Sequence, residues 1–204
     1  KFKAAKEAGD EVICILIASK LSGTYQGAML AKQIVDYDGI HVIDAGHAAA
    51  SVAEKMLVIA ACRMRDQGCT AEEIVRRLEQ LRGSVRLIAC LDTLEYLARG
   101  GRLPAAVASI GTKLQLKPII VFGENGEIQV VKKCMGSKRA MRDMTEMVTE
   151  CRINPEYPVI PIFAQNDRNC QEYVASLKNV GCVGAMQVPQ GIGATIGSYI
   201  GPGG

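Results

Sequence analysis

Short apolar runs and amphipathic stretches alternate along the first half of the chain. The apolar runs 11–18 and 40–44 predict two buried strands. Helical periodicity covers three longer stretches, at 23–35, 48–65 and 71–81. The last of these follows Thr70, and Glu73 stands at the spacing of a capping box. Strands separated by helices favour βαβ units and a mostly parallel sheet.

The second half of the chain has a mixed pattern. Strands are predicted at 85–91, 116–122, 127–131, 158–163 and 182–188, and helices at 93–98, 137–151 and 168–178. Asp92 and Glu95 have the spacing of a second capping box. The turn Gly123-Glu124-Asn125-Gly126 lies between two apolar runs, and its Asn-Gly pair predicts a hairpin with antiparallel strands.

These patterns predict the α/β class with two domains. We expect a parallel-sheet α/β domain at 1–83 and a mixed α+β domain at 84–204, divided at the break Arg82-Gly83-Ser84. The chain opens with neither a signal peptide nor a Met, and a short helix ending at Gly9 leads straight into the first strand. We therefore expect that upstream sequence is missing and that the first domain is incomplete.

The composition excludes several classes of protein. Of the 204 residues, 49% are hydrophobic and 22% charged, which is typical of a folded globular chain and not of a disordered one. The densest apolar run, 12–18, is far shorter than the ~20 residues of a membrane span. With 24 basic residues against 21 acidic ones, and no Trp, nucleic acid is a poor candidate partner.

The cysteine and histidine positions give no metal or redox motif. No two of the eight cysteines have the C-x-x-C spacing, so we interpret them as reduced thiols of a cytoplasmic protein. The two histidines, His41 and His47, flank the end of one predicted strand, with Asp44 as the only close carboxylate. A strand-end His and a loop His are a simpler interpretation than two metal ligands.

Nucleotide motifs are also missing. No G-x-x-x-x-G-K-[ST] occurs, and Gly191, Gly193 and Gly197 lack the G-x-G-x-x-G spacing. These glycines also follow no predicted strand that then enters a helix. Kinase or dehydrogenase activity is therefore not predicted for this chain alone.

The segment 18–24 is the best candidate for a ligand site, because it links the first strand to the following helix. Ligands gather at such carboxyl ends of parallel strands, and a helix N-terminus offers N–H donors to an anion. Ser22 adds a hydroxyl, and Gly23 allows close approach to the backbone. Ser22 as a simple helix cap is an equal alternative. For Gly100-Gly101-Arg102, a helix C-cap with a solvated Arg102 is the favoured interpretation.

Five segments resemble, in order, the successive signatures of the DegV family: IASKLSGTYQGA, HVIDAG, LDTLEYLARGGRL, IGTKLQLKPII and IGSYIGPGG. This is a family of fatty-acid-binding proteins that serve as acyl carriers for bacterial fatty acid kinase. The resemblance implies two α/β domains with a long-chain fatty acid, palmitate or similar, in a tunnel between them. It places the carboxylate at the turn of Ser22, Gly23 and Thr24, with Ser22 as the carboxylate-binding Ser. It also implies further family residues upstream of this chain and a last strand beyond it.

Two positions depart from the family pattern in members that act with the kinase. Tyr199 stands where such members usually have a His, and Met135 falls where they usually have an Arg. Both are candidate ligand-binding positions, but Tyr199 brings only a hydroxyl and Met135 no polar group. Apolar segments such as 119–121 and 159–160 belong either to the core or to the lining of the tunnel.

The leading hypothesis is a carrier without catalytic residues, metal or cofactor, which presents the fatty acid carboxylate to a separate ATP-dependent kinase. An alternative is an enzyme of small hydroxyl or phosphate compounds, because the resemblance also extends to the sheet topology of dihydroxyacetone kinase. A third possibility is a chain that folds but binds nothing without its upstream part.

Overall fold

The computed structural model of the chain describes residues 1–108, 115–179 and 186–203. It consists of two compact units, each described here by itself. The first unit comprises Lys1–Leu87 together with Phe122–Glu127, and the second comprises Ile88–Val121 and Ile128–Gly204. A domain is a part of the chain that folds independently, whereas these two units are defined by spatial compactness. The predicted domains 1–83 and 84–204 therefore remain a proposal.

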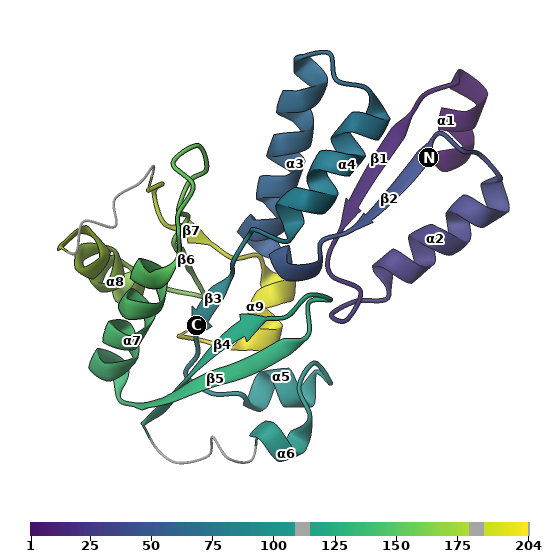
Figure 1. Cartoon of the computed structure of the whole chain (residues 1–204). Helices are drawn as coiled ribbons and strands as arrows, with labels where there is room; N and C mark the ends of the chain where they lie inside the picture. The colour runs from purple at the N-terminus through teal and green to yellow at the C-terminus, as the bar shows by residue number, and fades with distance from the viewer. Residues whose placement is uncertain (109–114, 180–185, 204) are drawn as a thin grey trace. The chain divides into compact units, whose positions relative to one another are not determined.

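The first unit is a three-layer α/β arrangement. Strands β1 (Val12–Leu16) and β2 (Ile40–Asp44) pair in parallel, from Val12 opposite Ile40 to Leu16 opposite Asp44. The crossover helix α2 (Thr24–Val35) lies with α1 (Phe2–Ala8) on one face of the pair (Figure 1). Helices α3 (Ser51–Asp66) and α4 (Ala71–Arg82) lie side by side on the other face. The βαβ unit with a parallel sheet is confirmed.

Local signals and burial together fix these helices. The predicted capping box of α4 is present, with the Glu73 N–H donating to Thr70 Oγ1 at 3.3 Å and Thr70 N–H donating to Glu73 Oε2 at 2.9 Å. The core between the helices and the strands consists of buried aliphatic residues, among them Ile43, Leu57, Ile74 and Leu78. Each such side chain contributes about 1.5–3 kcal/mol when fully buried, so this layer contact holds the unit together.

The second unit contains an antiparallel sheet in the order β3-β4-β5. Its strands are β3 (Ile88–Cys90), β4 (Leu116–Phe122) and β5 (Ile128–Met135). Strand β3 is antiparallel to β4, with Ile88 opposite Val121. The loop between β4 and β5 is closed by a hydrogen bond from Gly123 N–H to the backbone carbonyl oxygen of Glu127, and Gly126 has a φ of 81°. The predicted hairpin is therefore confirmed.

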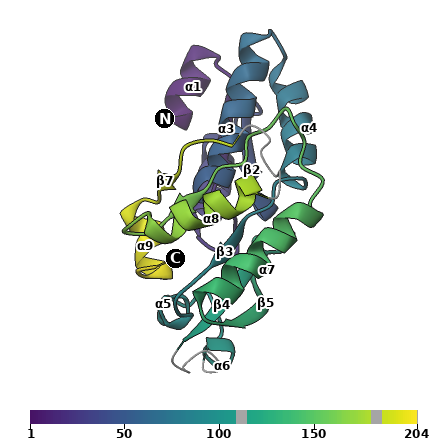
Figure 2. The same cartoon turned by 90° about the vertical axis from the view of Figure 1, so that its left-hand side faces the viewer.

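Helices cover this sheet and complete the second unit. Figure 2 shows α7 (Ser137–Glu150) along the sheet, and α8 (Arg168–Asn179) packs against α7. Ile119, Cys134 and Ala140 form the buried contact between α7 and the sheet. The remaining elements are α5 (Glu95–Arg99), α6 (Ala105–Ala108), β6 (Ile162–Phe163), β7 (Gln190–Gly191) and α9 (Ala194–Ile200). Strands β6 and β7 pair in parallel.

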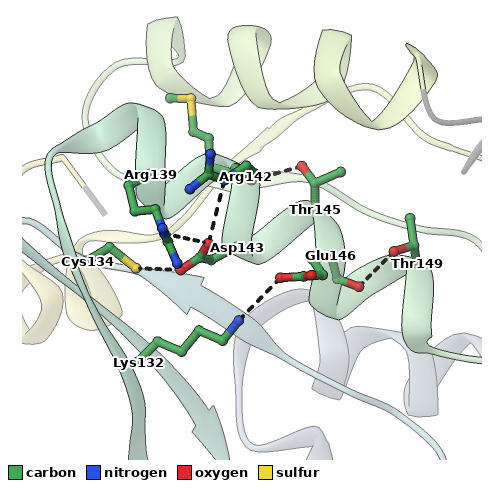
Figure 3. A network of polar contacts seen from close by, with 9 residues as sticks. Lys132, Cys134, Arg139, Arg142, Asp143, Thr145, Glu146 and Thr149 are labelled. Atoms are coloured by element: carbon green, nitrogen blue, oxygen red, sulfur yellow. Dashed lines mark hydrogen bonds and ion pairs between the residues drawn. The ribbon is translucent and has the colours of Figure 1, made fainter.

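Polar contacts fasten α7 to β5 beside this apolar contact (Figure 3). The carboxylate of Asp143, only 5% exposed, lies 2.9 Å from Arg139 Nε and accepts a hydrogen bond from the Cys134 thiol at 3.4 Å. The hydrogen bond from Arg139 lowers the pKa of Asp143 below its usual value. Lys132 on β5 pairs with Glu146 one turn further along α7, at 3.6 Å. Two charged groups of α7 thus fix its position along the strand.

The prediction of a second capping box at Asp92 and Glu95 is wrong. The N-cap of α5 is Leu94, and the Thr93 hydroxyl accepts a hydrogen bond from Glu95 N–H at 3.1 Å. The Asp92 carboxylate instead pairs with Lys117, whose Nζ lies 2.5 Å away. A charged partner 25 residues away in the chain replaces the local bond that the spacing favoured.

The end of the chain also differs from the prediction. Residues 182–185 of the strand expected at 182–188 lie outside the described residues, and Met186 forms a parallel bridge with Val159. The strand found here is β7, and Gly193 follows it as the N-cap of α9. The expectation that Gly191, Gly193 and Gly197 follow no strand entering a helix is therefore wrong, although their spacing remains G-x-G-x-x-x-G. The short helix α6 and the 3₁₀ turn η1 (Gly46–Ala48) had no predicted counterpart.

Candidate functional site

The candidate site lies in the first unit, where β1 gives way to α2. Residues 18–22 form a tight turn, here called the Ser22 turn, in which the Ala18 carbonyl accepts hydrogen bonds from Leu21 N–H at 2.9 Å and Ser22 N–H at 3.2 Å. Ala18 is fully buried, and its own N–H donates to Ala49 O at 2.8 Å. The turn is therefore tied to the segment that follows β2.

Asp44, the last residue of β2, links the same two segments through its side chain. Its Oδ1 accepts hydrogen bonds from Ser19 N–H at 3.1 Å and from Gly46 N–H at 2.9 Å. Its backbone oxygen accepts a hydrogen bond from the Arg82 guanidinium at 2.8 Å. From the sequence, Asp44 was a candidate only for a metal ligand, and this role was missed. Its position at a strand end, followed by Ala and Gly, was the available signal.

Ser22, Gly23 and Thr24 lead into α2, which begins at Thr24. Gly23 is the N-cap and has no side chain to bond, while Ser22 Oγ lies 2.7 Å from Thr24 Oγ1 and accepts a hydrogen bond from Thr24 N–H at 3.3 Å. The capping interpretation of Ser22 is therefore right about the hydrogen bond and wrong about the N-cap position. A Cβ built on Gly23 would meet no heavy atom within 4 Å, so the backbone here is open to a ligand.

This arrangement suits an anion. The first-turn N–H groups of a helix lack intrahelical acceptors and point out of its N-terminal end, where the helix dipole favours negative charge. The hydroxyls of Ser22 and Thr24 lie beside these groups, and the hydroxyl hydrogen that does not join the two oxygens is available to a ligand. The turn can therefore donate several hydrogen bonds to one carboxylate or phosphate oxygen pair.

The hairpin tip, residues Phe122–Glu127, packs against the Ser22 turn within the first unit. A Cβ built on Gly126 would overlap the Cβ of Ala18, and one built on Gly46 would lie 2.8 Å from the Glu124 oxygen. His47 Nδ1 lies 3.3 Å from the Phe122 oxygen. Two glycines thus allow the tip to approach the loops that follow β1 and β2.

His47 is hydrogen-bonded within the fold, and His41 lies beside a carboxylate without a hydrogen bond to it. Burial, helped by nearby Arg86, lowers the pKa of His47, which favours a neutral ring whose Nδ1–H donates to Phe122 O. His41 Nε2 lies 3.6 Å from the Glu11 carboxylate. Within residues 1–108, 115–179 and 186–203, no group of three or more His, Cys, Asp or Glu side chains is arranged to hold a metal ion.

Tyr199 lies on α9 in the second unit, and its ring packs against Gly100, where any Cβ would overlap it. The guanidinium of Arg102 lies 4.5 Å above the centre of the Tyr199 ring and donates to the Gly100 oxygen. The expectation of a solvated Arg102 is therefore wrong. The capping role of the two glycines is confirmed, because Gly100 is the C-cap of α5 and Gly101 has a φ of 73°.

Met135 ends β5 in the second unit and is 63% exposed. Val131 lies on the same exposed side of the strand, 44% exposed, with Lys133 between them. Of the predicted site residues, the structure brings together Ser22, Gly23 and Thr24. Tyr199 and Met135 belong to the other unit, and Arg102 joins Tyr199 there.

Comparisons with known proteins agree on one family. The model of the DegV family matches residues 1–204. A DegV domain-containing protein of Caldanaerobacter subterraneus is 35% identical over 198 residues, which cover 95% of this chain and 68% of that protein. The chain spans between 56% and 68% of the length of the first four curated relatives.

Solved structures share the fold. A fatty-acid-binding DegV family protein from Thermus thermophilus is 29% identical, with a TM-score of 0.78 over 99% of this chain and 71% of that one. The B3 protein of fatty acid kinase from Streptococcus pneumoniae, loaded with linoleic acid, is 21% identical, with a TM-score of 0.83 over 99% of this chain and 72% of that one. At the latter identity the likeness concerns the fold. The α/β fold class predicted from the sequence is confirmed.

Among the described helices, none is both long enough and apolar enough to span a membrane.

Proposed function

Because the chain belongs to the DegV family, we propose that it binds a long-chain fatty acid and carries it without catalysing a reaction of its own. The observation that carries this proposal is the match along the whole chain, which includes the Ser22 turn with its open N-terminal helix end. The Thermus thermophilus relative, 29% identical, binds fatty acid, which supports the same ligand class here.

The head group is the part of the ligand for which this structure offers donors. A carboxylate taken out of water without partners costs several kcal/mol, so it needs hydrogen bonds. The hydroxyl hydrogen that does not join Ser22 Oγ to Thr24 Oγ1 would supply one, and the N–H groups that follow Thr24 in the first turn of α2 would supply others, while Gly23 leaves the approach open. These groups would fix the orientation of the ligand.

The acyl chain would provide most of the affinity. Burying sixteen carbons is worth on the order of 10 kcal/mol at ~0.8 kcal/mol per CH₂. Among the apolar segments considered for the lining, Ile119 and Ile120 are fully buried in the structure, which supports their role in the core. Val159 and Ile160 are half-buried and remain candidates for contact with the chain.

A finer proposal is that the bound carboxylate is presented to a separate ATP-dependent fatty acid kinase in the cytoplasm. The ordered motifs support it, and the free thiols of the seven described cysteines fit a reducing compartment. Tyr199 lacks the charge of the family His, but Arg102 places a positive charge against its ring. Met135 has neither a charge nor a polar group to replace the family Arg. In the second unit, the support for this partnership therefore comes from the Arg102–Tyr199 pair.

The carrier function is tested by native mass spectrometry of the purified chain and by titration with palmitate and oleate. We expect an added mass that matches an acyl chain. Ser22→Ala should weaken palmitate binding by about 1–3 kcal/mol, or roughly 5- to 150-fold, if the hydroxyl bonds the carboxylate. The control is Ser176→Ala on α8, a half-buried Ser far along the chain from the turn, whose hydroxyl donates to Glu172 O. A chain that purifies empty and ignores both fatty acids would contradict the proposal.

The kinase partnership needs its own test. The loaded chain is mixed with ATP and the ATP-binding subunit of a bacterial fatty acid kinase, and acyl phosphate formation is measured. In that reaction a carboxylate oxygen attacks the γ-phosphorus and ADP leaves. The finer proposal would be supported if the unmodified chain yields acyl phosphate and the Arg102→Ala variant yields less of it. No acyl phosphate from a chain that binds palmitate would leave lipid binding as the function.

A further inference from the structure

We propose that Asp44 is a positioning residue for the fatty acid head group, because its carboxylate fixes the Ser22 turn and thereby the direction of the Ser22 hydroxyl. This inference rests on the proposed function. Asp44 does not itself touch the ligand in this proposal. It acts through the backbone of the turn.

The contacts form an unbroken path from Asp44 to Ser22. Asp44 Oδ1 holds the Ser19 N–H at 3.1 Å, and Ser19 directly follows Ala18. The Ala18 carbonyl in turn accepts the Ser22 N–H at 3.2 Å. Each bond restrains the peptide group to which the next one is made. Removing the first therefore loosens the turn where it leaves β1, while the Ala18 N–H stays bonded to the Ala49 oxygen.

Asp44 is itself held in place by its surroundings. It is the last paired residue of β2, opposite Leu16, and its backbone oxygen is bonded by Arg82. The same Oδ1 also accepts the Gly46 N–H at 2.9 Å, so one carboxylate oxygen clamps the loops that follow both parallel strands. A group fixed at the strand end is well suited to set the geometry of a neighbouring turn.

The sign of the charge separates a geometric role from an electrostatic one. A negative carboxylate near the site disfavours an anionic ligand, so the charge of Asp44 brings no affinity for a fatty acid. Accepting two N–H groups requires only a correctly placed oxygen, which an Asn side chain also provides. The proposal thus predicts that Asn replaces Asp44 and that Glu, which keeps the charge and moves the oxygen, does not.

The test compares palmitate with hexadecanol, which has the same chain length and no carboxylate. Affinities for both are measured for the unmodified chain, for Asp44→Ala, Asp44→Glu and Asp44→Asn, and for Asp38→Ala, an exposed Asp near the start of β2. We expect Asp44→Ala and Asp44→Glu to lose about tenfold in palmitate affinity, with hexadecanol binding changed less than about twofold. Asp44→Asn and Asp38→Ala should keep the preference for palmitate.

A double-mutant cycle with Ser22→Ala shows whether Asp44 acts through Ser22. In the Ser22→Ala background, Asp44→Ala should cause little further loss of palmitate affinity. If Asp44→Ala does not fold, the Asp44→Glu and Asp44→Asn pair decides by itself. An unchanged ratio of palmitate to hexadecanol affinity in Asp44→Glu overturns this inference alone. An unmodified chain that binds neither lipid overturns the carrier function, and this inference with it.

Discussion

Replacing Gly126 by Ala tests whether the hairpin tip supports the Ser22 turn. Gly126 has a φ of 81°, in the left-handed region, and its Cα faces the buried Ala18 at the start of the turn. A methyl group at this position would overlap the Ala18 Cβ and lie 3.2 Å from the Gly46 oxygen. Either the tip or the turn would have to move to relieve the contact.

Two costs add in this variant. Placing Ala in the left-handed region costs about 1–2 kcal/mol. The added methyl group in a filled space costs a further ~1–3 kcal/mol, because neighbouring atoms must shift. We therefore expect Gly126→Ala to lower the free energy of unfolding by about 2–5 kcal/mol. Because Ala18 opens the Ser22 turn, palmitate affinity should fall as well.

Gly68 offers a matched control, because it has nearly the same backbone angle, a φ of 82°, and no heavy atom within 4 Å of a built Cβ. Gly68→Ala therefore has the free-energy cost of the left-handed backbone without the cost of a packing overlap. Urea unfolding of both variants, followed by circular dichroism, isolates the contact with Ala18 as the difference between them. Equal destabilisation of the two variants, with unchanged palmitate binding, would show that the tip does not support the turn.

Two further predictions concern titratable side chains outside the candidate site. The hydrogen bond from Arg139 lowers the pKa of Asp143 in the folded chain below its ordinary value of 3.8. The ionised carboxylate therefore stabilises the fold above pH 3.8, and this stabilisation is lost as the pH falls through the lowered pKa of the folded state. Urea unfolding between about pH 6 and pH 3 should therefore show a flatter loss of stability in Asp143→Asn, and an equally steep loss would contradict this. Burial raises the pKa of Cys90 to about 12, so iodoacetamide should label the exposed Cys62 in the folded chain and Cys90 only in denaturant. Peptide mass spectrometry checks this order, and equal labelling of both thiols in buffer would refute it.

The parts of the fold that depend on near neighbours could be predicted from the sequence. Thr70 and Glu73 stand three residues apart, and their reciprocal capping bonds are present. Asn125-Gly126 gave the hairpin because its turn needs a left-handed residue, which Gly126 supplies. Such signals involve few residues and no partner from elsewhere in the chain.

Signals that compete with distant partners could not be weighed from sequence. Asp92 had the spacing of a cap, but Lys117 from β4 takes its carboxylate. Arg102 had the pattern of a solvated residue after a helix, but Tyr199 brings its ring there from α9. In both cases the winning interaction joins segments that only the tertiary fold brings together.

The candidate site shows the same division. The predicted change from a strand to a helix indicated Ser22, Gly23 and Thr24 as a candidate site. The family resemblance implied that their ligand is a carboxylate. The contacts that support them could not be foreseen, because Asp44 lies 25 residues after Ser19, and Gly126 lies more than a hundred residues after Ala18. Periodicity contains no information about such contacts.

The assignment of Phe122–Glu127 to the first unit has a consequence for how the protein is made. Residues 1–87 are synthesised before the tip, so Ala18 is made well before the residue that packs against it. The first unit is therefore complete only after β4 and the following loop have been synthesised, and the Ser22 turn gains its contact with Gly126 at that stage. For the carrier function proposed above, loading of a fatty acid would therefore follow synthesis of the hairpin.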